Sequence, residues 1–135
     1  MGDGPDKLAV QQHAVKLGIA DHVLFLGQRS DVNRLYQAFD VFCLPSLYEG
    51  LGIVGVEAQC AGLPCLFADA ITREVDVTGI PRFMTTESCK EWSSFISALE
   101  PGRRIDSSDK AFSDYDISEN ARKLTSMYLK LFEKK

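Results

Sequence analysis

Two glutamates separated by a glycine-rich turn are the residues of this chain best suited to bind a polar ligand. Glu49 and Glu57 lie eight positions apart, with Gly50, Gly52 and Gly55 between them. The apolar run before the turn predicts a strand, and the apolar run after it predicts a helix. Backbone N–H groups at a helix start lack partners within the helix, and the helix dipole adds about half a positive charge there. The turn is therefore predicted to bind an anion.

The two carboxylates restrict which anion fits. They would repel a bare phosphate, but each can accept hydrogen bonds from uncharged hydroxyl groups. A nucleotide diphosphate sugar offers both kinds of group. The N–H groups of Leu51, Gly52, Ile53 and Val54 would then hold the diphosphate. Glu57, about 7–8 Å further along the helix axis, would reach the ribose, and Glu49 would face the other end of the ligand.

A structural origin of the same pattern is also open. Glu49 could cap the helix and Glu57 could be a solvated helix residue. The glycines could then serve only to end the strand and form the turn. Gly55 favours close packing or ligand approach, because a glycine inside a helix costs about 1 kcal/mol relative to alanine.

The elements that must position the turn alternate along the chain. The expected strands are residues 23–27, 41–45, 64–68 and 81–84, and the expected helices are residues 7–17, 30–39, 52–60, 89–99 and a terminal helix from 118 onward. Leu8, Val15 and Leu17 would form the apolar side of the first helix. Residues 102–114 are polar and predict a surface loop. Because each strand is apolar throughout, we expect an α/β fold, a parallel sheet with helices on both faces, in a single domain over residues 1–135.

Composition excludes several classes of function. The chain has 135 residues, 45% of them hydrophobic, and a net charge of −4, which argues against nucleic acid or an anionic membrane as the main partner. No apolar run approaches the roughly 18 residues that span a bilayer. The four cysteines form no C-x-x-C pair and are predicted to be buried, reduced thiols of a cytoplasmic protein, with no metal site: Cys43, Cys60, Cys65 and Cys89.

In its motifs the chain resembles the retaining glycosyltransferases of family 4, which have the two-domain GT-B fold. The central motif is E-x7-E from Glu49 to Glu57, and the residues around it are Pro45-Ser46, Ala58 and Ala61-Gly62-Leu63-Pro64. The upstream matches are Gly2-Asp3-Gly4-Pro5, Val23-x-Phe25-Leu26-Gly27 and Asp31-Val32. Downstream, Ile71-Thr72-x-Glu74 is similar to the branch that builds bacterial exopolysaccharide or capsular polysaccharide. The resemblance runs from Gly2 to about Tyr128.

The resemblance implies a role for each residue of the turn. Glu49, the candidate catalytic residue, would contact hydroxyls of the donor sugar, and Glu57 would hold the ribose. Ser46 and the segment from Gly50 through Leu51, Gly52 and Ile53 to Val54 would bind the diphosphate. Gly27 and Arg29 would lie near the nucleobase. The donor would be a UDP-sugar, with no cofactor or metal required.

The resemblance also implies that the chain is the C-terminal, Rossmann-like half of a GT-B fold. The acceptor domain, which would bind a glycan or lipid-linked glycan, and the basic residues that neutralise the diphosphate would precede it. We therefore expect little transfer by this chain alone, self-association through uncovered apolar faces, and a cytoplasmic location beside the inner membrane face in the full protein. If the strand order is 3-2-1-4-5-6, two central strands are missing. We therefore expect an incomplete or rearranged sheet, closed either by direct pairing of strand 23–27 with strand 41–45 or by a partner chain.

Two other functions remain open. A nucleotide-sugar epimerase of the GT-B fold would share the architecture, although the E-x7-E motif beside Pro45-Ser46 counts against it. A non-catalytic nucleotide-binding or receiver-like module is the other alternative. Receivers carry acidic residues where strands end, whereas Asp40 begins a strand here.

Overall fold

The computed structural model describes residues 4–106 and 109–132. The chain divides into two compact units, Met1–Leu35 and Tyr36–Lys135. The expectation of one domain over residues 1–135 stays a prediction. Gly2 and Asp3, which belong to the upstream motif, lie outside the described residues.

The first unit is helical. It contains α1 (Lys7–Lys16), the short 3₁₀ helix η1 (Ala20–His22) and most of α2 (Val32–Tyr36), which confirms the first two expected helices. Ala14 is the buried residue of α1. The side chains expected to face a core, Leu8, Val15 and Leu17, are instead exposed. That expectation was wrong because the described part of this unit has no sheet on which an apolar helix face could pack.

The expected strand at residues 23–27 does not form. This segment has no strand assignment, and Leu24 and Phe25 are 83% and 38% exposed. Strand β1 (Phe42–Leu44) pairs with β2 (Cys65–Ala68) and with no other strand of the described chain. Direct pairing of strand 23–27 with strand 41–45, one of the two ways in which the sheet was expected to close, was therefore wrong, and completion of the sheet by a partner chain stays a prediction. A continuous apolar run predicts that its side chains will be buried. It does not supply the neighbouring strand whose backbone groups must form hydrogen bonds with it before a strand can form.

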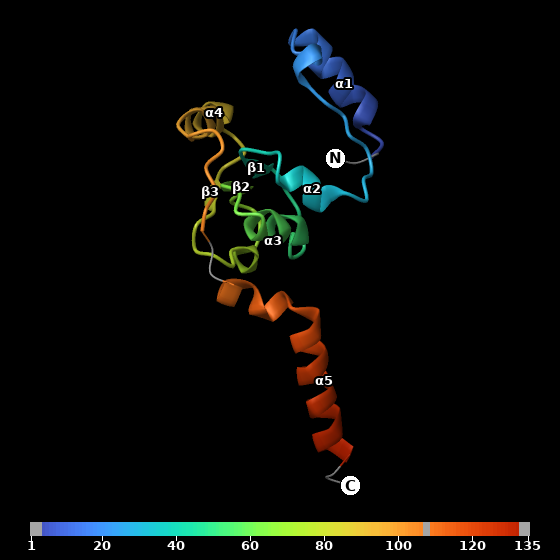
Figure 1. Ribbon diagram of the computed structural model, residues 1–135. Helices are drawn as coiled ribbons and strands as arrows, with labels where there is room; N and C mark the ends of the chain where they lie inside the picture. Colours follow the sequence, from blue (N-terminus) through green and yellow to red (C-terminus); the bar gives the residue numbers. More distant parts are fainter. Residues whose placement is uncertain (1–3, 107–108, 133–135) are drawn as a thin grey trace. The chain divides into compact units, whose positions relative to one another are not determined.

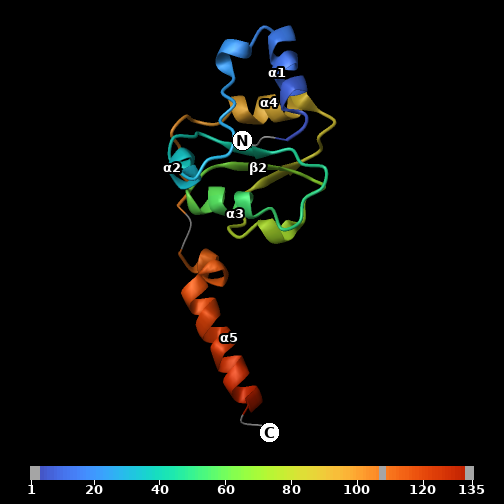
Figure 2. The same ribbon diagram turned by 90° about the vertical axis from the view of Figure 1, so that its right-hand side faces the viewer.

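The second unit is built on a three-stranded parallel sheet. Its order is β1-β2-β3, with β3 at Arg82–Met84, and the register places Phe67 beside Phe83. Figures 1 and 2 show α3 (Ile53–Cys60) on one face of this sheet and α4 (Cys89–Ser97) on the other. The three later strands and the parallel α/β class are confirmed.

The core of this unit lies around the central strand. All of β2 is buried, and Leu66, Phe67 and Ala68 are fully inaccessible to solvent. The Phe67 ring meets the Phe42 and Phe83 rings edge to face, with ring centroids 6.4 and 5.5 Å apart. Such aromatic contacts add to the burial energy and fix the strand register.

The cysteines are free, and half of them are exposed. Cys65 is buried and Cys43 is half-buried, and burial raises the pKa of both thiols, that of Cys65 to about 12. Cys60 and Cys89 are exposed. The prediction of buried thiols was wrong for these two, because each lies at an end of a helix rather than on a core-facing position.

Two 3₁₀ helices, η2 and η3, and the terminal helix complete the unit. The helix η2 (Arg73–Val75) lies between β2 and β3 in the chain. In α4, Trp92 donates a hydrogen bond from Nε1 to the carbonyl of Thr85 at 2.7 Å. Part of the expected loop at 102–114 forms the 3₁₀ helix η3 (Asp109–Tyr115) instead.

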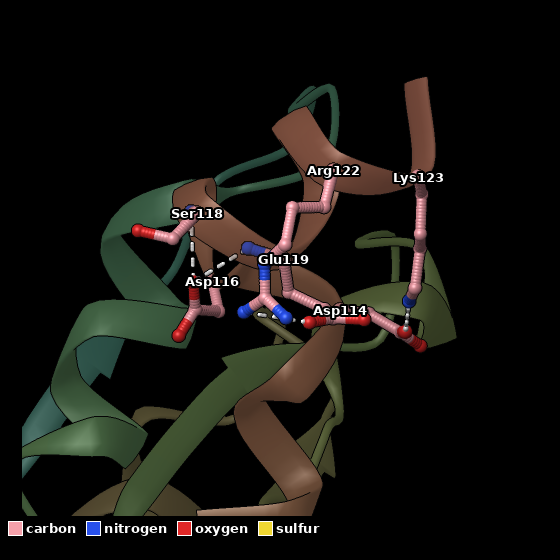
Figure 3. A network of polar contacts seen from close by, with 6 residues as sticks. All are labelled: Asp114, Asp116, Ser118, Glu119, Arg122 and Lys123. Atoms are coloured by element: carbon pink, nitrogen blue, oxygen red, sulfur yellow. Dashed lines mark hydrogen bonds and ion pairs between the residues drawn. The ribbon is translucent and has the colours of Figure 1, made fainter. Parts of the chain in front are cut away.

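The terminal helix α5 (Ile117–Phe132) has a well-capped start (Figure 3). The Asp116 carboxylate accepts hydrogen bonds from the N–H groups of Ser118 and Glu119 at 2.8 and 2.9 Å, and these bonds lower the pKa of Asp116. Arg122 pairs with Glu119 at 3.0 Å one turn further on. Across residues 4–106 and 109–132, no helix is both long and apolar enough to cross a bilayer.

Candidate functional site

The predicted turn connects β1 to α3. Strand β1 ends at Leu44, and α3 begins at Ile53. Gly52 is the N-cap residue of α3 and has left-handed backbone angles, φ 66° and ψ 48°. A Cβ atom on Gly52 would lie 3.3 Å from Glu49 Cγ and 3.5 Å from Val75 Cγ2. The left-handed conformation therefore favours glycine at this position, and a Cβ would also have to displace the exposed Glu49 side chain slightly.

The start of α3 presents backbone donors that are not used within the protein. The N–H groups of Leu51, Gly52, Ile53 and Val54 donate to no acceptor among the described residues, and no side chain caps the helix. The N–H of Gly55 is already engaged by the carbonyl of Gly52 at 2.7 Å. Free donors together with the positive end of the helix dipole make this turn able to bind an anion.

The two glutamates flank these donors. Both are exposed, and Glu49 forms no hydrogen bond or ion pair with any other part of the described chain. Glu57 lies in the second turn of α3, where one carboxylate oxygen, Oε2, accepts a hydrogen bond from the hydroxyl of Tyr36 at 3.1 Å. Glu49 and Glu57 thus each retain acceptor capacity for a ligand hydroxyl.

Tyr36 is a residue of this site that the sequence interpretation missed. Its side chain is only 2% exposed, and its hydroxyl lies 3.3 Å from the carbonyl of Val54 as well as near Glu57. Burial and the neighbouring Glu57 charge raise the pKa of Tyr36 to about 12. The sequence offered one signal for this residue, a tyrosine at the end of a short helix. A tyrosine that becomes buried there normally needs a hydrogen-bond partner for its hydroxyl.

Close packing fixes the position of α3 on the sheet. A Cβ on Gly55 would lie 2.9 Å from both Phe67 Cζ and Val75 Cγ2, so the missing side chain lets α3 approach β2 and η2. Of the two readings of Gly55, the structure therefore supports close packing.

Gln59 adds a polar link between α3 and the segment after η2. Its side chain is 3% exposed, and Nε2 donates to the carbonyls of Gly55 and Val75 at 3.0 and 2.7 Å. Oε1 accepts from Val77 N–H and the Thr78 hydroxyl at 3.2 and 3.0 Å. A buried amide with all four bonds made holds the C-terminal half of α3 against residues 75–78.

The other predicted site residues fall into two groups. Ser46 is half-buried on the same turn, and Ile53 and Val54 are 60% and 41% exposed at the helix start. Gly27 and Arg29 belong to the first unit, so their place near the nucleobase stays a prediction.

Arg29 already has a partner. Its guanidinium forms two hydrogen bonds of 2.7 Å with the Asp31 carboxylate. The pair raises the pKa of Arg29 and lowers that of Asp31. In the described part of the chain, no group of three or more His, Cys, Asp or Glu side chains is arranged to hold a metal ion.

Comparison with known proteins decides the family. The family described as glycosyl transferases group 1 matches residues 1–78, more than half of the chain. The chain belongs to this family. The matched region contains the whole turn from β1 to α3, with Glu49 and Glu57.

The individual relatives include proteins named as glycosyltransferases and one named for polysaccharide biosynthesis. The chain is 37% identical over 133 residues to the glycosyltransferase EpsF of Bacillus subtilis, a match covering 94% of this chain and 35% of that protein. It is 36% identical over 89 residues to the Vi polysaccharide biosynthesis protein VipC/TviE of Salmonella typhi, covering 65% of this chain and 15% of the relative. A UDP-Gal:alpha-D-GlcNAc-diphosphoundecaprenol alpha-1,3-galactosyltransferase of Escherichia coli is 42% identical over 53 residues, covering 39% and 14%. The chain thus matches about a third or less of each relative's length.

Proposed function

We propose that this chain is the donor-binding part of a retaining, family 4 glycosyltransferase of the GT-B fold that builds bacterial polysaccharide. One observation carries the proposal: four unused backbone N–H groups lie at the start of α3, between two glutamates that can accept hydroxyl hydrogen bonds. This combination suits a nucleotide diphosphate sugar, which places two negatively charged phosphates between two groups of neutral hydroxyls.

Each residue of the turn has a proposed role. The N–H groups from Gly50 to Val54, with Ser46, bind the diphosphate. Glu57 accepts hydrogen bonds from the ribose hydroxyls, and Glu49 accepts them from the donor sugar. The nucleobase, taken to be uracil, would lie near Gly27 and Arg29.

The proposed chemistry is transfer of the sugar to an acceptor hydroxyl. The bond between the anomeric carbon and the diphosphate oxygen breaks, the acceptor oxygen bonds to the same face of that carbon, and its proton passes to the departing diphosphate oxygen. The turn contributes by orienting the donor and by stabilising the charge that develops on the departing diphosphate. The proposal requires neither a cofactor nor a metal.

The acceptor side of the reaction is proposed from the relatives. One of them is named for a lipid-linked diphosphoundecaprenol acceptor, and another for polysaccharide biosynthesis. We propose a glycan or lipid-linked glycan acceptor, bound by a separate N-terminal domain, and a cytoplasmic site of action beside the inner membrane face. Because donor binding and acceptor binding would lie on different domains, this chain by itself is expected to bind donor without efficient transfer.

Calorimetric titration of the chain with UDP tests the proposal. We expect binding by the wild-type chain that weakens by roughly 1–3 kcal/mol in Glu57→Ala, the usual cost of leaving hydrogen-bonding groups unpaired. Inorganic pyrophosphate has no ribose, so its binding should not weaken in that variant. Glu91→Ala, which removes another exposed helix glutamate, is the matched control and should leave UDP binding unchanged. Absence of UDP binding to the wild-type chain, or equal affinity for Glu57→Ala, would overturn the proposal.

A further inference from the structure

The hydroxyl of Tyr36 connects a rigid aromatic cluster to an exposed acidic side chain. Tyr36 is nearly inaccessible, whereas its partner Glu57 is exposed to solvent. An exposed glutamate normally samples several side-chain conformations, at a cost in entropy when a ligand must select one of them. A fixed donor that bonds one carboxylate oxygen removes part of that cost before the ligand arrives.

The aromatic neighbours fix where the hydroxyl points. The Tyr36 ring meets the Phe39 and Phe42 rings edge to face, with centroids 6.4 and 5.9 Å apart. Phe42 belongs to β1 and in turn contacts Phe67 of the central strand. The position of the Tyr36 hydroxyl is therefore set by aromatic contacts that lead to β2, the fully buried central strand.

The bond has a defined direction. Because the pKa of Tyr36 is raised to about 12, its hydroxyl keeps its proton at physiological pH and can donate to Glu57. The bond uses Oε2 of Glu57 and leaves Oε1 for another donor. A ribose supplies neighbouring hydroxyl donors that suit such a remaining oxygen.

We infer that Tyr36 is a positioning residue that holds the Glu57 carboxylate in the orientation required by the ribose hydroxyls of the donor. This inference rests on the proposed function, because it assumes that Glu57 accepts hydrogen bonds from the ribose. It adds a residue that acts through Glu57 and does not itself contact the ligand.

A structural role is the competing explanation. The Tyr36 hydroxyl also lies 3.3 Å from the carbonyl of Val54, so it could serve only to attach α3 to the preceding segment. The two roles differ in one respect. A structural role affects every ligand of the turn equally, whereas a positioning role affects only ligands with ribose hydroxyls.

The test compares UDP with 2′,3′-dideoxy-UDP, which has the same base and diphosphate but no ribose hydroxyls on the ring edge. Calorimetric Kd values are measured for the wild-type chain, Tyr36→Phe, Glu57→Ala and the double variant. Tyr36→Phe keeps the ring and its aromatic contacts, and thermal unfolding checks that it is folded. Tyr128→Phe, the same change on exposed α5, is the matched control.

We expect Tyr36→Phe to raise the Kd for UDP about three- to tenfold, the usual effect of one ordinary hydrogen bond, because the lost bond acts on the ligand only through Glu57, and to change the Kd for the dideoxy analogue less than about twofold. In the Glu57→Ala background, adding Tyr36→Phe should change neither value, because coupled residues lose their effect together. Tyr128→Phe should match the wild-type chain for both ligands.

Four other results would overturn the inference. An equal loss for UDP and its dideoxy analogue, or no loss for either, would exclude a positioning role while leaving the proposed function intact. A wild-type chain that does not bind UDP, or that binds the dideoxy analogue equally well, would overturn the ribose assignment of Glu57 and this inference with it.

Discussion

The site depends on how three side chains differ in exposure. Glu49 and Glu57 are open to solvent, and Tyr36 is buried beneath α3. A buried phenol next to a carboxylate keeps its proton more firmly than a free phenol, because ionisation would place two negative charges close together in a poorly solvated place. This difference can be measured without any ligand.

The alkaline stability of the chain should depend on Tyr36. Its pKa is raised from the ordinary 10.0 to about 12, so between these values the folded state binds more protons than the unfolded state. The stabilisation is complete below pH 10 and is lost as the pH rises toward 12. We expect the free energy of unfolding of the wild-type chain, relative to Tyr36→Phe, to fall by on the order of 1–2 kcal/mol over that range.

Urea unfolding at several pH values measures this difference, and the absorbance of ionised tyrosine at 295 nm follows the titration itself. Tyr36 should be the last tyrosine to ionise, and its step should be missing in Tyr36→Phe. Ionisation of all tyrosines near pH 10, with parallel stability curves for the two proteins, would contradict the environment described for Tyr36.

At the residue scale, the sequence motif predicts the turn but not the hydrogen bond from Tyr36 to Glu57 beside it. Glu49, Gly52 and Glu57 are close in sequence, so spacing alone places them around one helix start. The link from Tyr36 to Glu57 spans 21 positions and exists only because the last residue of α2 lies against α3. No local pattern records such a contact.

At the scale of elements, one close approach determines how near α3 lies to β2 and η2. The position of Gly55 against Phe67 and Val75 leaves no space for a methyl group without movement of the fully buried Phe67. The same approach brings the unused N–H groups at the start of α3 to the end of β1. The geometry of the turn therefore depends on packing three residues beyond the N-cap.

Gly55→Ala should destabilise the chain. Alanine gains about 1 kcal/mol in helix propensity, but overpacking against the fully buried Phe67 and Val75 should cost the upper part of the usual range of about 1–3 kcal/mol, so a net loss of up to about 2 kcal/mol is expected. Denaturant unfolding measures it. Gly50→Ala is the control for stability, because a Cβ at Gly50 meets nothing within 4 Å. An equal or greater stability of Gly55→Ala would show that α3 packs less closely than described here.

The elements also show what the sequence could predict. Strands β1, β2 and β3 and the later helices were located because each has a partner nearby in the chain: α3 connects β1 to β2, and β2 has a neighbour on each side. Residues 23–27 carry an equally apolar pattern but form no strand. Whether such a segment forms a strand depends on a neighbouring strand to pair with. A local sequence pattern does not show whether a pairing partner exists elsewhere in the chain.

At the scale of the whole molecule, the two units differ in how many of their apolar side chains are buried. The second unit has a continuous core around β2, whereas Ala14 is the buried apolar residue of the first unit. On α5, Leu124, Tyr128 and Leu131 are 50–58% exposed and share one face of the helix. Exposed apolar faces of this kind favour association. The expected self-association of the chain stays a prediction.

The central claim is that the start of α3 binds the diphosphate of a nucleotide donor. The most direct test is the ¹⁵N–¹H spectrum of the labelled chain during titration with UDP. The account predicts that the amide resonances of Leu51, Gly52, Ile53 and Val54 shift the most, because their N–H groups gain hydrogen bonds to the phosphates. Saturable UDP binding that leaves these four resonances unchanged, or no binding at all, would contradict it.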